Sequence, residues 1–482
     1  MEIAQREQIT IYSVSSYMTC VIFSGLLLAS TLVSTVHSQT ADALTVTIDV
    51  AVDRALQRNP TLRISQETLN ETQATSWQAT TSLLPRLDIS GTVARFDPNL
   101  FSRESFVTID EQRSAQLRAS YSVLSGGEKY GKTRAARALA KAAMHNHEAS
   151  RLATIQLVRT AFYDVLLTDQ LVDVAQEAVD INKEEVRRAK VQFDIGEAAK
   201  INVLRAEVQL ANSIPELLQA KHNRRLTKAR LANLIAFDLD PSDIEANSLV
   251  VEGTLESSRR LKLPPLGRLI TAAKANRPEL RSAQSQESAA RGEAWTTWAG
   301  LLPKVDVYGA WDWRGADGNV NIDIGQSRFV SNNKGWEIGA TASMPLFDFF
   351  GNVKGVQAGR ARVRQAEIAE EDLSRQIDLE VRTSYSGYLE AVEALRSQEK
   401  NVERARESLR LSRESQSAGE ATQLDVQQAQ LDLTQARSLF ATASRNLLIA
   451  ESSLLSSIGL SDLPAAQRFG IEVEQIEEHD TK

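Results

Sequence analysis

Hydrophobic residues along this chain change their spacing from three or four residues to two and back again, twice. Helical spacing dominates two long proline-free stretches, Gly131–Asp194 and Gly355–Ser417. A helix of roughly sixty residues spans about 95 Å, far more than a globular core needs, which indicates a coiled-coil-like wall or shaft. Gly196 and Gly419 end these helices, and a second helix is expected after each turn, over 201–235 and 424–458. The sequence therefore predicts two long helical hairpins.

Four shorter stretches alternate hydrophobic and polar residues, which indicates strands with one apolar and one polar face. From Ala115 to Val123 the hydrophobic residues occupy the odd positions, and from Trp336 to Met344 the even positions. The expected strands are residues 85–96, 113–124, 303–314 and 335–347, paired two by two. Strands of about ten residues are long enough to cross a bilayer when tilted. The polar segments within each pair, 97–112 and 315–334, are expected to be loops.

Aromatic residues distinguish these strands from those of a soluble sandwich, which would alternate as well. Tyr121, Trp311, Trp313 and Trp336 lie on the apolar faces, several of them near strand ends. Aromatic residues in such positions typically mark the boundary between membrane and water. We therefore expect these four residues to be membrane-interface aromatics.

The hairpins and strands belong to an internal repeat. The segment Leu83–Ile89 (LLPRLDI) recurs as Leu301–Val307 (LLPKVDV) at an offset of 218, whereas Gly196-Glu197-Ala198 recurs as Gly419-Glu420-Ala421 at an offset of 223. The difference of five residues indicates an insertion, which is expected in a loop. The sequence thus predicts two repeats, 44–240 and 265–460, joined by a linker at 241–264 and followed by a C-terminal tail at 461–482.

Residues 1–43 are expected to be a secretory signal peptide. An apolar core around Val21–Leu28 is followed by two small-residue cleavage patterns, Val36-His37-Ser38 and Ala41-Asp42-Ala43. The first residues carry almost no positive excess, so a retained membrane anchor is the alternative. The only cysteine, Cys20, lies in this segment, and cleavage would leave no thiol for disulfides, metal binding or nucleophilic catalysis.

The amino-acid composition and the absence of certain motifs argue against several classes of function. The 482 residues include 55 Lys and Arg against 62 Asp and Glu, a net charge of −7, which argues against nucleic-acid binding. The sequence contains no phosphate- or dinucleotide-binding glycine motif, and His145 and His147 are two residues apart instead of the four that a metal site on a helix needs. We expect no enzyme activity, cofactor or metal, so any energy for transport must come from a partner.

Four strands cannot close a barrel. An open sheet edge in lipid leaves backbone groups unsatisfied at several kcal/mol each, and closure needs about eight strands. A closed cyclic oligomer is the simplest solution. Three chains would supply twelve strands, but two or four chains would also close.

The chain resembles the TolC-type outer membrane efflux proteins from about residue 44 onward. The resemblance rests on the Asn59-Pro60 and Arg277-Pro278 helix starts, the repeated Leu-Leu-Pro, Pro345-Leu346-Phe347-Asp348 with Gly351, and the glycine turns within 193–207 and 418–430. It implies a mainly α fold with transmembrane β: long antiparallel hairpins form a periplasmic α-barrel, and four strands per chain join a trimeric twelve-stranded outer-membrane β-barrel. A mixed belt would come from Asp238–Pro265 and the tail.

The resemblance further implies a passive export duct of a tripartite efflux or secretion system. Its partners would be two further copies of the chain, outer-membrane lipid, a periplasmic membrane-fusion adaptor and an inner-membrane pump of the RND, ABC or MFS type. The hairpin turns would be periplasmic tips that contact the adaptor through Ile195, Gly196, Ala418 and Gly419. Charged residues beside them are gate candidates, with ordinary solvated charges as the alternative: Asp194, Glu197, Arg413, Glu414 and Glu420.

Two other classes of protein share some of these features. A secreted coiled-coil structural protein would explain the helices but not the amphipathic strands with tryptophans. A periplasmic adaptor would contain one hairpin per chain and a lipoyl-like β module, whereas this chain predicts two hairpins. The exported substrate and the class of pump cannot be predicted from the sequence.

Overall fold

The computed structural model describes residues 44–97, 107–197, 199–246, 248–255, 259–322, 325–462, 464, 467 and 469–475. The chain forms two units, Met1–Leu44 and Thr45–Lys482. The expected signal peptide lies outside the described residues. All that follows concerns the second unit.

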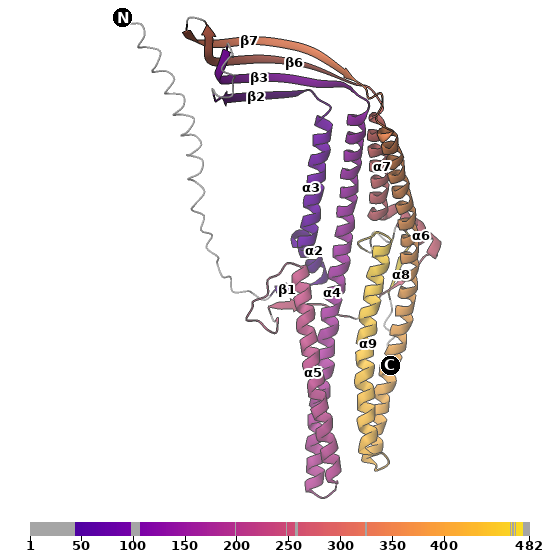
Figure 1. Cartoon of the computed structure of the whole chain (residues 1–482). Coiled ribbons are helices and arrows are strands. Elements are labelled where there is room, and N and C mark those ends of the chain that lie inside the picture. The colour runs from indigo at the N-terminus through magenta and orange to yellow at the C-terminus, as the bar shows by residue number, and fades with distance from the viewer. Residues whose placement is uncertain are drawn as a thin grey trace. The chain divides into compact units, whose positions relative to one another are not determined.

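The second unit contains the same succession of elements twice (Figure 1). The first half comprises α2 (Ile48–Arg58), α3 (Pro60–Thr81), β2 (Arg86–Arg95), β3 (Val107–Ser125), α4 (Glu128–Asp194) and α5 (Lys200–Leu234). The second half comprises α6 (Leu266–Asn276), α7 (Pro278–Ala299), β6 (Lys304–Ile322), β7 (Gly325–Ser343), α8 (Gly351–Ser417) and α9 (Gln423–Ser457). Corresponding helices have equal lengths of 11, 22, 67 and 35 residues. The structure therefore confirms the internal repeat.

The long helices form two antiparallel hairpins, α4–α5 and α8–α9 (Figure 1). Gly196 and Gly419 end α4 and α8 with φ of 81° and 80°, a left-handed conformation that glycine adopts without steric cost. The return helix α9 begins with a capping box, in which Thr422 and Asp425 satisfy each other's backbone N–H groups. Within the part of the chain that the structure describes, no helix is both long and apolar enough to cross a membrane.

Strands β2, β3, β6 and β7 form one antiparallel sheet in the order β2-β3-β6-β7, at one end of the helices (Figure 1). The expected pairs β2–β3 and β6–β7 are confirmed, and β3–β6 joins the two halves. The expected strand lengths were wrong for β3, β6 and β7, which have 19 residues each. Residues 107–112, 315–322 and 325–334, expected in loops, continue the strands. Apolar residues are sparse in these segments, and in β6 they move from odd positions up to Trp313 to even positions at Ala316, Val320 and Ile322, so the earlier alternation does not continue.

The five-residue insertion lies at the turn between the sheet and the second long helix. Only Gly126 and Gly127 separate β3 from α4, whereas the seven residues Met344–Phe350 separate β7 from α8. The strand pairs themselves have equal spans. A loop therefore holds the insertion, as expected.

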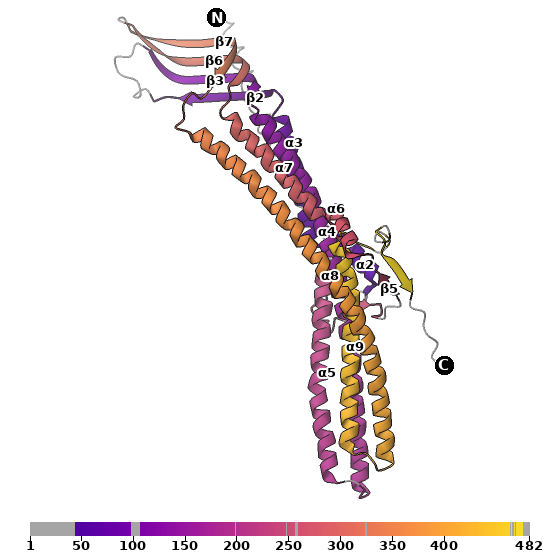
Figure 2. The same cartoon turned by 90° about the vertical axis from the view of Figure 1, so that its right-hand side faces the viewer.

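A large apolar core lies around the middle of α8 and the C-terminal part of α9 (Figure 2). Leu269 of α6, Ile377 and Val381 of α8 and Leu454 of α9 are buried there together with Ile471 of the tail. Beside this core the linker strand β5 (Arg259–Lys262) pairs with the tail strand β8 (Glu472–Gln475). In the first half, β4 (Leu249–Val251) pairs with β1 (Leu44–Val46). The segments that the resemblance assigned to a belt thus do meet at mid-height.

Candidate functional site: the sheet face and the hairpin tips

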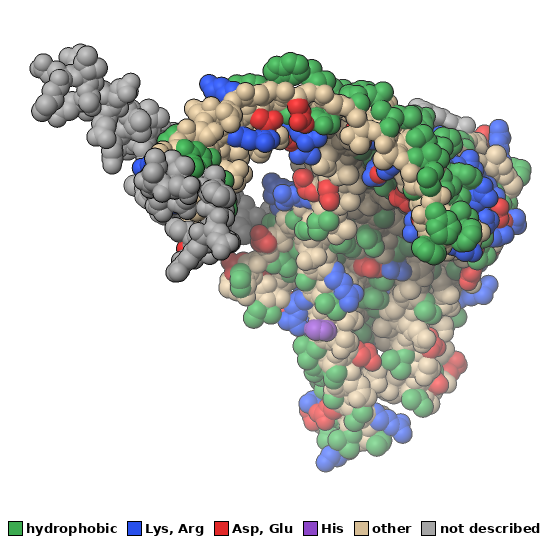
Figure 3. Space-filling view, turned by 45° about the horizontal axis from the view of Figure 1, so that its top comes forward, with side chains coloured by type: hydrophobic (Ala, Val, Ile, Leu, Met, Phe, Trp, Pro, Cys, Tyr) green, Lys and Arg blue, Asp and Glu red, His purple; other side chains and the backbone are tan. Residues whose placement is uncertain are grey.

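One face of the sheet carries a continuous apolar surface. The strand register places Ile89, Leu117, Trp311 and Trp336 in one cross-strand row, and all four side chains are exposed. The next row, on the opposite face, contains Asp88, Arg118, Ala310 and Glu337. Figure 3 shows charged side chains on the concave side of the sheet. A soluble protein would cover so large an apolar surface, so this face requires an apolar environment.

Three of the four predicted interface aromatics gather at one level of this face. Trp311 lies directly opposite Trp336, and the Trp313 indole, one position further along the same face, donates a hydrogen bond to Asn332. Tyr121 pairs with Val307, closer to the helices, so it does not join this cluster. Beyond Trp313 this face becomes polar, and Arg113 contacts both Glu111 and Asp317. The aromatic cluster therefore marks the end of the apolar surface that is farther from the helices.

The junction between sheet and helices is held by a carboxylate with two cationic partners. Glu128, the first residue of α4, accepts hydrogen bonds from Lys132 and from Lys304 of β6, each at 2.6 Å. These two bonds lower the pKa of Glu128 to about 2. The carboxylate therefore stays ionised and ties the second strand pair to the first long helix.

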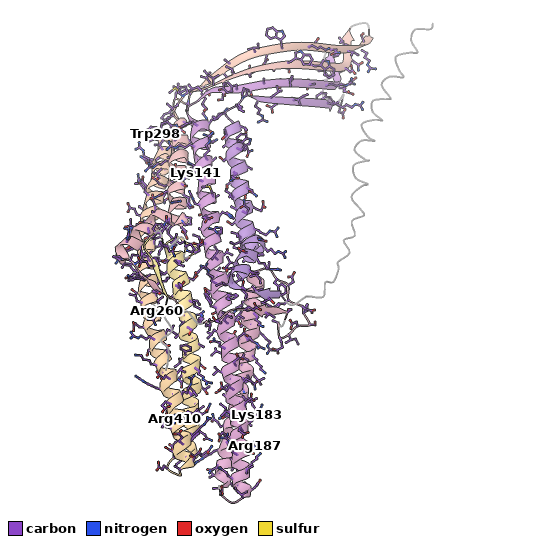
Figure 4. All side chains as sticks on the ribbon, turned by 180° about the vertical axis from the view of Figure 1, so that it is seen from behind. Lys141, Lys183, Arg187, Arg260, Trp298 and Arg410 are labelled. Carbon is purple, nitrogen blue, oxygen red and sulfur yellow. The ribbon has the colours of Figure 1, made fainter. Side chains whose placement is uncertain are left out.

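The predicted tip residues lie at the two hairpin ends that are farthest from the sheet (Figure 1). Ile195 is 62% exposed, and Gly196, Ala418 and Gly419 are exposed as well. In Figure 4, Lys183 and Arg187 lie near the α4–α5 turn, and Arg410 lies near the α8–α9 turn. Apolar and charged side chains are thus mixed at both tips, a composition typical of a docking surface with a polar rim.

The five gate candidates do not form one cluster within the chain. Glu414 pairs with Arg410 of its own helix at 2.5 Å, and Arg413 donates a hydrogen bond to Gln430 across its own hairpin. Asp194, Glu197 and Glu420 are exposed and have no ion-pair partner among the described residues of the chain. These three carboxylates are therefore free to pair with cations of another chain.

The sequence did not reveal a series of polar contacts between the two hairpins. Side chains of α4 meet side chains of α9 at four levels: Gln156 with Ser453 at 2.9 Å, Asp164 with Arg445 at 2.5 Å, Glu177 with Arg437 at 2.5 Å and Glu185 with Gln423 at 3.1 Å. We call these contacts the inter-hairpin ladder. Its partners are more than 230 residues apart along the chain, and each looks like an ordinary solvated residue in the sequence. No local pattern could have identified them.

The histidines do not form a binding site. His147 shares a hydrogen bond with Ser65 of α3, and burial lowers the pKa of His145, with the charges of Arg281 and Lys141 adding to the effect. Nowhere in the described ranges do three or more His, Cys, Asp or Glu residues group as metal ligands would.

An apolar sheet face of membrane-crossing length, continued by paired hairpins of very long helices, defines a channel-forming protein of an outer membrane. The chain belongs to the outer membrane efflux protein family, whose model matches residues 51–236 and 269–460. It is therefore an outer-membrane efflux channel, with the sheet in the membrane and the helices in the periplasm. The family is one of channels, not of enzymes.

Similar proteins agree with this assignment. Nodulation protein T of Rhizobium leguminosarum bv. trifolii is 22% identical over 408 residues, which are 84% of this chain and 81% of that protein. The pyoverdine export outer membrane protein OpmQ of Pseudomonas aeruginosa is 23% identical over 431 residues, 86% of this chain and 84% of that protein. The crystal structure of the outer membrane protein VceC of Vibrio cholerae superposes with a TM-score of 0.71 at 19% identity, covering 86% of this chain and 96% of that chain. These relatives give no support to the coiled-coil alternative.

Proposed function

We propose that three copies of this chain close one twelve-stranded barrel and together form a passive export duct. The observation that carries the proposal is the four-stranded sheet, because in the part of the chain that the structure describes its outer strands β2 and β7 each leave one backbone edge unpaired. In lipid these edges need partners, and β7 of one copy can pair with β2 of the next. Tyr121, Trp311, Trp313 and Trp336 then face lipid around the ring.

The assembled mass tests this proposal. The protein, extracted from outer membranes in mild detergent, is expected to give a protein mass by light scattering close to three times that of one mature chain. A dimer or tetramer would contradict the number of subunits. A monomer that stays soluble without detergent would contradict the shared barrel itself.

We further propose that the hairpin tips are both the docking site and the gate. Ile195, Gly196, Ala418 and Gly419 present backbone and apolar surface to a periplasmic adaptor, which couples the duct to an inner-membrane pump. Asp194, Glu197 and Glu420 lack ion-pair partners among the described residues of the chain, and they ring the entrance when copies assemble. Arg413 and Glu414 hold the α8–α9 turn through their contacts within that hairpin.

The inter-hairpin ladder supports a closed entrance, since it ties α9 to α4 along their length. We expect the double variant Asp164→Asn with Glu177→Gln to raise the open probability of single channels in planar bilayers. Partly exposed pairs contribute little each, so we expect a combined effect of about 1 kcal/mol, roughly fivefold in the ratio of open to closed channels. The Arg445 and Arg437 partners remain in place.

The matched control is Glu407→Gln. The partner of Glu407, Arg410, is on the same helix, so this variant removes an ion pair without uncoupling the hairpins. Its open probability should equal that of the parent protein. If the control opened the channel as much as the double variant, or if neither did, the ladder would not hold the gate.

A further inference from the structure

The inserted segment Met344–Phe350 repeats the backbone of the corresponding glycine turn but carries phenylalanines. Gly126 and Gly127 precede α4 with φ of 61° and 84°. At the equivalent positions, 223 residues later, Phe349 and Phe350 precede α8 with φ of 51° and 67°. Glycine adopts the left-handed backbone conformation at two consecutive positions without a steric penalty. For residues with side chains as large as phenylalanine, the same conformation is strained.

The first half has a steric reason for its glycines. A Cβ atom on Gly126 would lie 2.8 Å from the carbonyl oxygen of Ala299, and one on Gly127 would lie 2.6 Å from the indole nitrogen of Trp295. In the second half nothing comparable fills the space, because the Phe349 and Phe350 side chains are 85% and 64% exposed. Burial therefore does not account for the strained phenylalanines.

The segment extends the apolar face of the sheet without a break. Trp336, Ile338 and Met344 are exposed on that face, and Leu346, next in the alternation, is 91% exposed. The Phe347 ring lies 4.8 Å from the Phe349 ring and 6.3 Å from the Phe350 ring, measured between centroids. We call Met344, Leu346, Phe347, Phe349 and Phe350 the phenylalanine loop. Figure 3 shows hydrophobic side chains gathered at the end of the sheet that joins the helices.

The one acidic side chain of the segment does not interrupt this surface. The Asp348 carboxylate accepts a hydrogen bond from the backbone nitrogen of Asn352 at 2.6 Å, so it caps the start of α8. Because Asp348 is only half-exposed, the outward side of the loop consists of hydrophobic side chains alone. A surface that holds only hydrophobic side chains excludes a strongly hydrated partner.

Cations follow the loop within the first turns of α8. Lys354 and Arg360 are exposed, and in the described parts of the chain neither has a carboxylate partner. Arg360 lies over the ring of Trp298, 5.2 Å from its centroid, on the flank of α7 seen in Figure 4. Aromatic side chains followed by unpaired cations match the order of acyl chains and phosphates at one boundary of a bilayer.

We propose that the phenylalanine loop inserts into the periplasmic leaflet of the outer membrane, where lipid acyl chains cover its rings and lipid phosphates meet Lys354 and Arg360. The proposal rests on the assignment of the apolar sheet face to lipid. A neighbouring copy is not the expected cover, because strand pairing uses the backbone edge of β7, whereas the loop continues the face of the sheet. The loop fixes the depth of the channel at the boundary opposite the Trp311, Trp313 and Trp336 cluster.

A spin label at Phe349 distinguishes whether lipid, water or protein surrounds the phenylalanine loop. The parent for labelling is Cys20→Ser, which lacks cysteine, and Phe349→Cys and Glu403→Cys are labelled in the full protein in vesicles of bacterial phospholipid. At Phe349 we expect collisions with oxygen, which concentrates in lipid, to exceed collisions with a water-soluble nickel chelate several-fold. At the exposed α8 position Glu403 we expect the reverse.

Each other outcome at Phe349 contradicts the proposal. A label accessible to nickel would place the loop in water. A label immobilised and shielded from both agents would mean that a second copy covers it. The assembled mass, measured on the same samples, shows separately whether the trimer has formed, so a failed trimer and a failed lipid contact are distinguishable.

The double variant Phe349→Gly with Phe350→Gly tests the loop by restoring the glycine turn of the first half. It relieves the strained backbone, so the thermal midpoint in detergent should stay equal or rise. Retention in vesicles during alkaline extraction should fall several-fold, whereas Ile368→Ala, an exposed apolar residue elsewhere on α8, should leave retention unchanged. Unchanged retention of the double variant would overturn the proposal.

Discussion

Replacing Gly292 with alanine is expected to destabilise the junction of the two repeats by about 1–3 kcal/mol, the usual cost of overpacking a tight contact. Gly292 of α7 faces Gly131 of α4, and a Cβ atom on it would lie 2.7 Å from the backbone nitrogen of Ala135 and 3.0 Å from the carbonyl oxygen of Gly131. These are backbone atoms, which cannot move aside as the end of a flexible side chain can. The two helices would have to separate along their whole contact.

The matched control is Gly387→Ala on α8. Gly387 also lies within a long helix, but apart from its chain neighbours and the nearby backbone of its own helix, no atom of the described residues lies within 4 Å of the position that its Cβ would occupy. Alanine favours the helix over glycine by about 0.5–1 kcal/mol, so this variant should be slightly more stable than the parent. Thermal midpoints in detergent give both values. Equal shifts for the two variants would show that the close contact between α4 and α7 does not limit stability.

The helical part of the fold could be predicted from the sequence because its signals are local. Hydrophobic spacing, the absence of proline and the glycines at 196 and 419 define α4 and α8, and both helices end as expected, at Asp194 and Ser417. The internal repeat tested each predicted element a second time, because each element was expected in both halves of the chain. Long helices with clear ends are the kind of element that pattern reasoning identifies best.

The sheet was predicted only where the apolar residues stay on one face. From Leu87 to Val93 and from Trp336 to Met344 the alternation is clear, but in the continuation of β6 the apolar residues change to the opposite face, at Ala316 and Val320. The change of face interrupts the pattern that runs up to Trp313, so the predicted strand ended there. The offsets between the repeats gave the length of the insertion, five residues, but not its position. Only the structure shows that Gly126–Gly127 corresponds to the end of Met344–Phe350.

The candidate site was predictable in its position but not in its contacts. The glycine turns identified the tips, because a helix end with φ above zero has a strong sequence preference. The contacts of Glu414 with Arg410 and of Arg413 with Gln430 depend on side-chain directions that residue type does not specify. The inter-hairpin ladder joins the two repeats, so its residues become partners only once the whole chain is folded.

Replacing Arg277 with methionine is expected to destabilise the second hairpin by about 2–3 kcal/mol, because it leaves a buried carbonyl oxygen unsatisfied. The Arg277 side chain is only 10% exposed and bonds three groups: Glu279, Glu380 at 2.9 Å and the carbonyl oxygen of Ser457 at 3.2 Å. Burial opposes the charge of Arg277, but the bonds to Glu380 and Glu279 outweigh burial, and the pKa is raised. The guanidinium thus remains charged in the folded state.

Replacing Arg277 with asparagine should restore most of that stability, because the first repeat uses asparagine at the equivalent position. Asn59 donates to the carbonyl oxygen of Leu234 at 2.9 Å, and its side-chain oxygen caps α3 by accepting from the backbone nitrogens of Thr61 and Leu62. Arg277 gives α7 no such cap, so asparagine there should contribute about 1 kcal/mol as a cap and satisfy Ser457 as well. Thermal midpoints of both variants, alone and combined with Glu380→Gln, separate the two roles. Equal losses for methionine and asparagine, both removed by Glu380→Gln, would mean that Arg277 acts through its charge and not by anchoring the end of α9.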